Sequence, residues 1–381
     1  MQQLEQKLLK RLESREENES LRELGHNQNL IDFSSNDYLG FSKNQNIYSK
    51  TLELLKKHKL EQNGSGGSRL ISGNSNLYDI VEQEIAKGHN VESALIFNSG
   101  YNANVGLISA VCLKGDVILF DEFCHASIRE GIQLSHAKSY KFKHHNLTDL
   151  ELKLKKFSNN TIYIITESVF SMDGDSPDLD TLISLSKTYN AKLIIDEAHA
   201  VGVFGEHGCG LINTHNANSV FARVVTFGKA LGCHGAAILG SNLLKTYLIN
   251  FSKPFIYTTA LAPHAVATIS CAYKELLSSN AQITLRQNII FFNEELVRLQ
   301  LKTDFIVSDS AIQSALISGN SNVKWVSEQL QENQYDVKAI LSPTVPEHHE
   351  RLRFCLHSFN TKEEITQVLT LLKQTLYAKS I

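Results

Sequence analysis

The stretch KLIIDEAHAVGVFGEHGCG (residues 192–210) joins a short apolar run to an acidic pair and a histidine. Other mostly apolar runs occur at residues 93–98, 116–121, 161–168, 223–228 and 235–240. Such near-continuous apolar runs are typical of parallel strands whose two faces are both buried. Because helix-length segments separate most of the runs, the sequence predicts a doubly wound α/β domain with a mostly parallel sheet.

Polar residues stand where these predicted strands end: Ser99, Asp121, Glu167, Asp196 and Thr226. In open α/β sheets, ligands bind beyond the carboxyl ends of the strands. We therefore expect a ligand site at this edge of the sheet.

The pattern changes beyond about residue 275. A long helical stretch (281–301) precedes a second helix (322–333), three short strand-like segments and a capping box at Thr361 and Glu364 that predicts a last helix. Residues 4–24 carry leucines among charges, which predicts an amphipathic N-terminal helix. We expect an N-terminal helix and arm (1–45), a large α/β domain (46–278) and a small α+β domain (279–381).

Composition bounds the function without identifying it. The chain has 381 residues, 42% of them apolar and 20% charged, with a net charge of −3. These values exclude a disordered chain, and they give no whole-molecule attraction to nucleic acid or an anionic membrane. The six scattered cysteines suggest free thiols in a reducing compartment. With no signal-peptide pattern and no membrane-length apolar run, we expect a cytoplasmic enzyme.

The D-E-A-H sequence at residues 196–199 has more than one interpretation. A nucleotide-dependent helicase would also need a G-x-x-x-x-G-K-[ST] loop. The chain has none, because Gly228-Lys229 is followed by alanine. Acidic residues also cap strands for purely structural reasons, so the motif is ambiguous by itself.

Lys229 follows a strand in VVTFGKALGCHGAAILG (residues 224–240), among small residues and between two apolar runs. Most lysines are solvated charges, but a desolvated lysine has a lowered pKa and can form an imine with an aldehyde. FNSGYNAN (97–104) opens a helix whose free N–H groups suit a phosphate. His125 follows another strand end. An imine-forming lysine, an acid for a ring nitrogen and a phosphate cradle together indicate pyridoxal phosphate.

At this point the sequence resembles the α-oxoamine synthases, a group of fold-type-I pyridoxal-phosphate enzymes. The matching stretches run in order over most of the chain: FSSNDYLG (33–40), GSGGSRLISG (64–73), FNSGYNAN (97–104), HASI (125–128), ESVFSMDGD (167–175), DEAHAVGVFGEHGCG (196–210), TFGKALG (226–232), IYTTALAP (256–263) and SPTVP (342–346). The resemblance implies a large sheet domain with a smaller C-terminal α+β domain.

The resemblance also implies residue roles at the cofactor. Lys229 forms the imine and moves the α-proton, Asp196 pairs with the ring nitrogen, and His199 hydrogen-bonds the ring oxygen. His125 stacks on the ring and contacts substrate. The other implied cofactor contacts are Gly100, Tyr101, Ser171, Thr226, Thr258 and Thr259. The two threonines at 258 and 259 resemble a pair that reaches the phosphate of a partner subunit, which implies a homodimer. No metal is expected.

Further roles implied by the resemblance concern the substrates. Asn36, Thr344 and Arg353 match substrate positions, and Arg353 is expected at the amino-acid carboxylate. Arg22 matches the N-terminal substrate arginine, with Arg15 as a competitor.

Two features depart from the family. Leu341 occupies a position where the family often has an arginine that contacts a substrate carboxylate. That contact is either supplied by His348, His349 or Arg351, or lost. The segment between the N-terminal helix and FSSNDYLG is also shorter than usual.

The branch that fits best condenses L-alanine with a pimeloyl thioester carried by coenzyme A or a carrier protein. Other branches stay open as alternatives. They are 2-amino-3-ketobutyrate ligase, 5-aminolevulinate synthase, serine palmitoyltransferase and the autoinducer synthases. The DEAH-type nucleotide-binding protein is the alternative from a different class.

Overall fold

The computed structural model describes residues 2–24, 29–212 and 217–379. Contacts divide the chain into two compact units. The larger comprises Asn36–Ser171 and Ser176–Thr284, and the smaller comprises Met1–Ser35, Met172–Asp175 and Leu285–Ile381. The boundaries expected from the sequence, after residues 45 and 278, stay a prediction.

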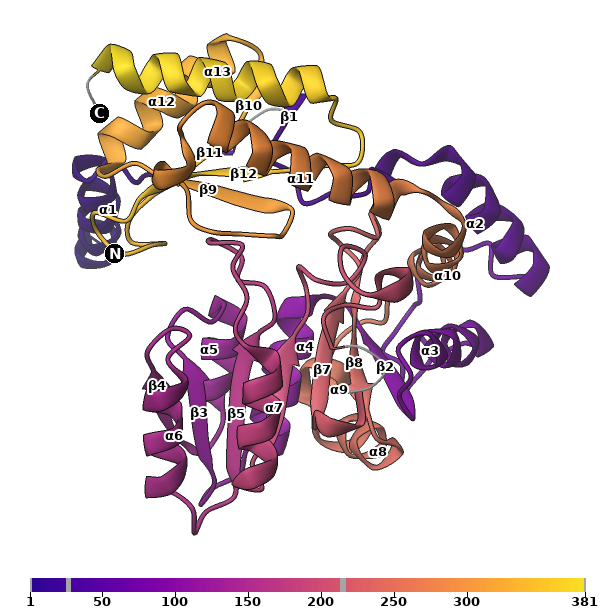
Figure 1. The fold of residues 1–381 in the computed structure, drawn as a ribbon. Coiled ribbons are helices and arrows are strands. Elements are labelled where there is room, and N and C mark those ends of the chain that lie inside the picture. Colours follow the sequence, from indigo (N-terminus) through magenta and orange to yellow (C-terminus); the bar gives the residue numbers. More distant parts are fainter. Residues whose placement is uncertain (1, 25–28, 213–216, 380–381) are drawn as a thin grey trace. The chain divides into compact units, whose positions relative to one another are not determined.

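A seven-stranded sheet forms the centre of the larger unit (Figure 1). Its strand order is β2-β8-β7-β6-β5-β3-β4. The strands are β2 (Ser93–Phe97), β3 (Val117–Asp121), β4 (Lys138–Phe142), β5 (Ile162–Glu167), β6 (Lys192–Asp196), β7 (Ala222–Thr226) and β8 (Ala236–Gly240). Only β8 runs antiparallel to its neighbours, so the predicted mostly parallel sheet is confirmed.

Helices cover both faces of this sheet, as expected for a doubly wound fold (Figure 1). One face packs against α6 (Leu147–Lys156) and α7 (Leu179–Thr188). The other packs against α4 (Gly100–Val111), α5 (Ala126–Leu134), α8 (Asn242–Phe251) and α9 (Lys253–Ile256). The remaining α-helices that lie wholly in this unit are α2 (Gln45–His58), α3 (Asn76–Gly88) and α10 (Pro263–Ser278). Burial on both faces explains why the central strands are almost purely apolar.

The sequence missed strand β4, which lies at the edge of the sheet. Its residues read KSYKF, and only Phe142 is buried. An edge strand exposes much of its surface, and charged side chains there protect it from pairing with other chains. A search for apolar runs therefore passes over it.

The smaller unit contains a three-stranded antiparallel sheet in the order β11-β12-β9. Its strands are β9 (Ile312–Leu316), β11 (Lys338–Ile340) and β12 (Arg351–Cys355), with the short pair β1 (Ile31–Asp32) and β10 (Tyr335–Asp336) forming a separate sheet. The helices are α1 (Gln2–Glu17), most of α11 (Ala281–Arg298), α12 (Asn320–Glu332) and α13 (Lys362–Lys379).

Two helix termini show how the sequence sets these elements. The backbone N–H of Thr361 donates to Glu364, and the N–H of Glu364 donates to Thr361 Oγ1, so the predicted capping box forms before α13. Helix α1 is shorter than the expected span to residue 24, because the chain turns at Glu19 with a φ of +50°. Among the described residues, no helix is long and apolar enough to cross a membrane.

Candidate active site

A cavity of about 260 Å³ lies at the carboxyl ends of β5, β6 and β7, beside the start of α4. Most of the predicted cofactor residues line it, although they come from segments far apart in the sequence. The predicted site residues in its wall are Asn36, Gly100, Tyr101, His125, Asp196, His199, Thr226 and Lys229. Asn36 was expected at the substrate, and here it shares a cavity with the cofactor residues.

Asp196 ends strand β6 and is nearly buried. Asn104 Nδ2 donates to Asp196 Oδ2 at 2.6 Å, and the backbone N–H of Ala198 donates to Asp196 Oδ1 at 2.9 Å. These two donors fix the orientation of the carboxylate toward the cavity. A carboxylate held in this position can balance a protonated ring nitrogen.

Lys229, His199 and Tyr38 form a hydrogen-bonded chain. Lys229 Nζ lies 2.7 Å from His199 Nε2, and His199 Nδ1 lies 2.7 Å from the Tyr38 hydroxyl. The Tyr38 hydroxyl donates to Asn36 Oδ1 at 3.1 Å. One proton arrangement satisfies all three contacts: Lys229 donates to Nε2, and the Nδ1 proton of His199 goes to the tyrosine oxygen. The lysine amine is thereby held inside the cavity.

His125 caps the start of α5. Its Nδ1 accepts from the backbone N–H of Ser127 at 3.2 Å, so the ring proton of the neutral form lies on Nε2. Burial lowers the pKa of His125, and the positive charge of Lys229 lowers it further, while Asp196 opposes the shift. The lowered pKa favours the neutral form of the ring, whose proton lies on Nε2.

Glu167 ends β5 and lies under His125. Its Oε1 accepts from the backbone N–H of His125 at 2.6 Å. Burial, together with the nearby charge of Asp196, raises the pKa of Glu167 to about 8. A carboxyl group that is protonated near neutrality avoids placing a second negative charge beside Asp196.

The sequence reasoning missed three residues at this site: Tyr38, Asn104 and, as a site residue, Glu167. Glu167 had a signal, since it ends a predicted strand. Tyr38 lies in a recognised motif, but nothing local indicates that it contacts His199. Asn104 lies one helical turn after Gly100, on a helix face that only the fold directs toward Asp196.

The start of α4 provides the phosphate-binding geometry expected from FNSGYNAN. Ser99 caps the helix by accepting from the N–H of Asn102 at 3.2 Å. The first N–H groups of a helix have no intrahelical partner and attract anions. A Cβ on Gly100 would lie 2.5 Å from Thr226 Cγ2, so glycine is needed for this approach to β7.

A buried ion pair supports the D-E-A-H segment from behind. Glu197 is fully buried and pairs with Arg223 of β7, whose Nε donates to Glu197 Oε2 at 2.6 Å. The other oxygen of Glu197 accepts from the N–H groups of Leu211 and Ile212 at 2.7 and 3.0 Å. The second acid of the motif is therefore structural, and it ties the segment after Asp196 to the sheet.

Three predicted cofactor residues do not line this cavity. Ser171 lies in the turn after β5 and is partly exposed. Asn98 Nδ2 donates to Thr258 Oγ1 at 3.3 Å and to the carbonyl of Thr259 at 2.7 Å. The expected contact of these threonines with a partner's phosphate stays a prediction.

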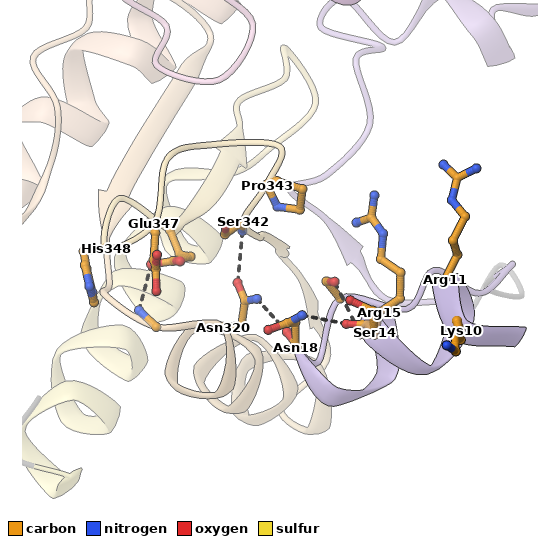
Figure 2. A pocket seen from close by; sticks show the side chains of 13 residues that line it. Lys10, Arg11, Ser14, Arg15, Asn18, Asn320, Ser342, Pro343, Glu347 and His348 are labelled. Carbon is orange, nitrogen blue, oxygen red and sulfur yellow. Dashed lines mark hydrogen bonds between the residues drawn. The ribbon is translucent and has the colours of Figure 1, made fainter. Parts of the chain in front are cut away.

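Two of the predicted substrate residues of the smaller unit contact each other. Arg22 Nη2 donates to Thr344 Oγ1 at 3.2 Å. Arg353 lies on β12 and is buried between β11 and β9. Arg351 is also buried and pairs with Asp173, so it is not a free cation. His348 lines a separate cavity of this unit (Figure 2).

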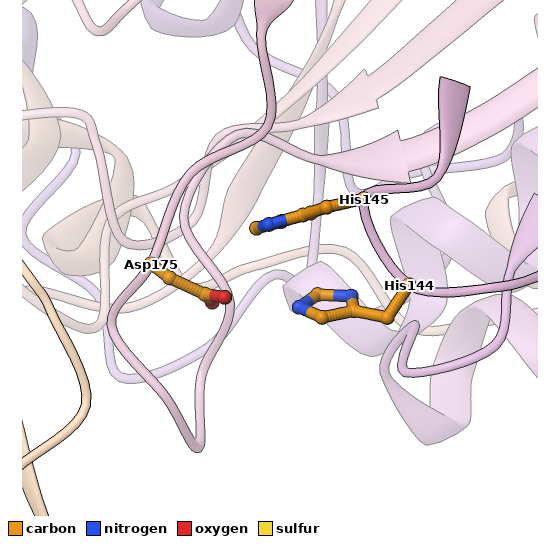
Figure 3. Close-up of side chains that lie close together, drawn as sticks. All are labelled: His144, His145 and Asp175. Atoms are coloured by element: carbon orange, nitrogen blue, oxygen red, sulfur yellow. The ribbon is translucent and has the colours of Figure 1, made fainter. Parts of the chain in front are cut away.

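Asp121, the remaining acid at a strand end, has a different role from Asp196. Its Oδ1 lies 2.9 Å from His144 Nδ1, and its Oδ2 accepts from the backbone N–H of His145 at 3.1 Å. The two histidine rings stack with their centroids 3.8 Å apart (Figure 3). Asp121 thus organises the turn after β4 and is not part of the cavity wall described above.

Comparisons with known proteins identify the family. Residues 28–372 match the sequence model of aminotransferase class I and II. An 8-amino-7-oxononanoate synthase from Emericella nidulans is 39% identical over 360 residues, which cover 89% of this chain and 87% of that protein. The chain belongs to the aminotransferase class I and II family.

Comparison with solved structures shows which members of this family the chain resembles in fold. The crystal structure of 8-amino-7-oxononanoate synthase from Francisella tularensis is 32% identical, with a TM-score of 0.78, and the match covers 92% of this chain and 99% of that one. A serine palmitoyltransferase variant from S. paucimobilis has a TM-score of 0.86 at 24% identity, covering 92% and 88% of the two chains. The expected fold-type-I architecture and the resemblance to α-oxoamine synthases are confirmed.

The cavity of this aminotransferase-family chain fits pyridoxal phosphate. It offers an amine at Lys229, a fixed carboxylate at Asp196 and the amino end of α4 within one wall. These are the groups that an aldehyde, a pyridinium nitrogen and a phosphate require. The predicted cofactor agrees with the donor set that the structure brings together.

Proposed function

We propose that the protein condenses L-alanine with a pimeloyl thioester to give 8-amino-7-oxononanoate, CO2 and a free thiol. The Cα of alanine loses its proton and bonds to the acyl carbonyl carbon, and the thiol leaves. The alanine carboxylate then departs as CO2, and a proton takes its place on Cα. The observation that carries the proposal is the convergence of Lys229, His199, Asp196 and His125 on one cavity. The relatives named 8-amino-7-oxononanoate synthase support this choice of substrates.

Pyridoxal phosphate, when bound, supplies an aldehyde for amine capture and a protonated ring that accepts the electrons left by a departing α-proton. Lys229 is the base for that proton, because its amine is the one held in the cavity. His199, which is held in place by its hydrogen bond with Tyr38, orients the amine of Lys229. Asp196, fixed by Asn104, keeps the ring nitrogen protonated.

His125 acts on the acyl group. Its Nε2 proton is free to be donated, since Nδ1 is occupied at the start of α5. A fixed donor of this kind stabilises the negative charge that develops on the thioester oxygen during attack. Replacement of His125 by alanine should therefore slow condensation more than it weakens cofactor binding.

The substrate carboxylates are assigned to arginines of the smaller unit. Arg353 is proposed for the carboxylate of alanine, since arginine holds a carboxylate through two parallel hydrogen bonds. Arg22, positioned by Thr344, is proposed for the acyl donor. With Leu341 in place of an arginine, the distal carboxylate of the acyl chain has fewer direct partners there.

The assembly and the compartment follow by analogy. We propose a homodimer in which Thr258 and Thr259 approach the partner's phosphate, and a cytoplasmic location. Both rest on the family resemblance and not on contacts within this chain.

Two experiments test the function. Addition of pyridoxal phosphate should produce an absorbance band near the visible that is missing from Lys229→Ala. Thiol release should then be measured for alanine, glycine and serine against pimeloyl and palmitoyl thioesters of coenzyme A. Preference for alanine with the pimeloyl donor is expected. Preference for glycine, for serine or for the palmitoyl donor would assign the protein to another α-oxoamine synthase, and ATP hydrolysis without the band would reject the enzyme class.

A further inference from the structure

A second and larger cavity, of about 600 Å³, lies within the smaller unit (Figure 2). One wall is the C-terminal half of α1, where Lys10, Arg11 and Arg15 contribute to the lining. The opposite wall is formed by the start of α12 and the loop from Ser342 to Glu350. Its volume lies in the range of cavities that bind ligands of nucleotide size, which is roughly 300 to 1,000 Å³.

The walls of this cavity are joined by specific hydrogen bonds. Asn320 Nδ2 donates to the carbonyl oxygen of Asn18, and Asn320 Oδ1 accepts from the N–H of Ser342 at 3.0 Å (Figure 2). Glu350 is buried and accepts from the N–H of Gly319 at 2.8 Å. Asn320 thus links the end of α1 to the loop at 342, which makes the cavity a built feature of this unit.

The charge on the α1 wall is not neutralised locally. Among the residues that the structure describes, no ion pair within 4.0 Å involves Lys10, Arg11 or Arg15. The lining includes two carboxylates: Glu350 is engaged as above, and Glu347 is exposed. Three cations and two carboxylates therefore line the cavity, which leaves the lining with a net positive charge. Arg11 and Arg15 extend from the helix in the same direction (Figure 2).

We propose that this cavity binds the phosphate-bearing nucleotide portion of a coenzyme A thioester. The proposal rests on the proposed function, which requires an acyl thioester. Two arginines and a lysine match a group with several phosphates, since guanidinium groups bind phosphate oxygens through two parallel hydrogen bonds. The amide and hydroxyl groups of the opposite wall suit a purine and a ribose.

The position of the cavity in the smaller unit supports the same ligand. Ser342 lines it, and Thr344, two residues further on, contacts Arg22. The loop that lines this cavity thus also positions Arg22, the residue proposed for the acyl donor. A lone carboxylate needs one arginine and leaves most of a cavity of this size empty.

A carrier protein is the less suitable occupant. A stable contact between two proteins buries about 800 Å² on each partner. The cations here line a cavity and not a flat surface of that area. The geometry thus favours the free coenzyme as donor over the carrier protein.

The test uses Arg11→Gln and Arg15→Gln, with Lys7→Gln as the matched control, because Lys7 is an exposed cation of α1 outside the cavity lining. Binding of free coenzyme A and of dephospho-coenzyme A is measured by calorimetry at two salt concentrations. Turnover is measured with pimeloyl-coenzyme A and with a pimeloyl N-acetylcysteamine thioester, which has no nucleotide. An intact pyridoxal-phosphate band confirms that each variant is folded.

Each arginine variant should weaken coenzyme A binding about tenfold and raise the KM for pimeloyl-coenzyme A by a similar factor at unchanged kcat. The nucleotide-free thioester and Lys7→Gln should show no change, and dephospho-coenzyme A should bind more weakly than coenzyme A. Equal behaviour of the arginine variants and the control would overturn the proposal. If the unaltered enzyme turns over neither thioester but still binds coenzyme A through these arginines, the proposed condensation is rejected and the nucleotide site is retained.

Discussion

Replacing Arg223 by methionine would remove one partner of the buried ion pair behind the D-E-A-H segment. Arg223 is 1% exposed and Glu197 is fully buried. Besides Glu197, Arg223 reaches the carbonyl oxygen of Cys209, to which its Nη2 donates at 2.7 Å. Methionine fills a comparable volume without charge, so the variant removes the ion pair and the hydrogen bond to Cys209 without opening a large cavity.

The expected loss of stability depends on the hydrogen bonds that Glu197 retains. Removal of one partner of a buried ion pair typically costs about 3–5 kcal/mol, because the remaining charge is left unpaired. Glu197 still accepts from the N–H groups of Leu211 and Ile212, which places the expected cost at the low end, about 3 kcal/mol. At about 2–4 °C per kcal/mol for a domain of 150–250 residues, the melting temperature should fall by roughly 6–12 °C.

The assay is thermal unfolding of the cofactor-free protein, followed by circular dichroism. Arg286→Met serves as the control, because Arg286 is an exposed arginine of α11. Its change should stay within about 0.5 kcal/mol. The double variant with Glu197→Leu should recover part of the loss and not all of it, since two N–H groups then lack their acceptor. Equal melting temperatures for Arg223→Met and Arg286→Met would refute the reasoning.

Three further predictions concern the site itself. Because the pKa of Glu167 is raised from 4.5 to about 8 in the fold, its ionisation destabilises the folded protein as pH rises through that window. The difference in melting temperature, cofactor-free Glu167→Gln minus wild type, should therefore become more positive from pH 5 to pH 8. A difference that does not change with pH would contradict this. Asn104→Ala removes the donor to Asp196 and should weaken pyridoxal-phosphate affinity about tenfold in an absorbance titration, whereas unchanged affinity would show that Asp196 needs no such support. Gly232 has a φ of +60°, and a Cβ there would lie 2.2 Å from the backbone nitrogen of Ser42, so Gly232→Ala should cost about 2 kcal/mol or more of unfolding free energy. Gly228→Ala, whose nearest contact is 3.5 Å, is the matched comparison, and equal stability of the two variants would disprove the clash.

The sequence by itself determined six of the seven strands of the central sheet and placed Lys229 and Asp196 at its edge. Strands β2, β3 and β5 to β8 are apolar runs that can be recognised locally, because burial on both faces removes polar residues from them. Lys229 and Asp196 follow such runs directly, and strand ends of a parallel sheet gather at one edge. Their convergence therefore follows from pattern and topology alone.

Only the tertiary structure decided which side chains support these residues. Asn104 contacts Asp196 across 92 positions of sequence, and Tyr38 contacts His199 across 161. The link of Asn320 to Ser342 spans 22 positions, and the contact of Arg22 with Thr344 spans 322. Hydrophobic periodicity is a local property of the chain, whereas hydrogen bonds between distant segments depend on how packed elements orient their side chains. The acidic pair at 196 and 197 illustrates the difference: the two carboxylates are neighbours in sequence, yet one faces the cavity and the other is buried against Arg223.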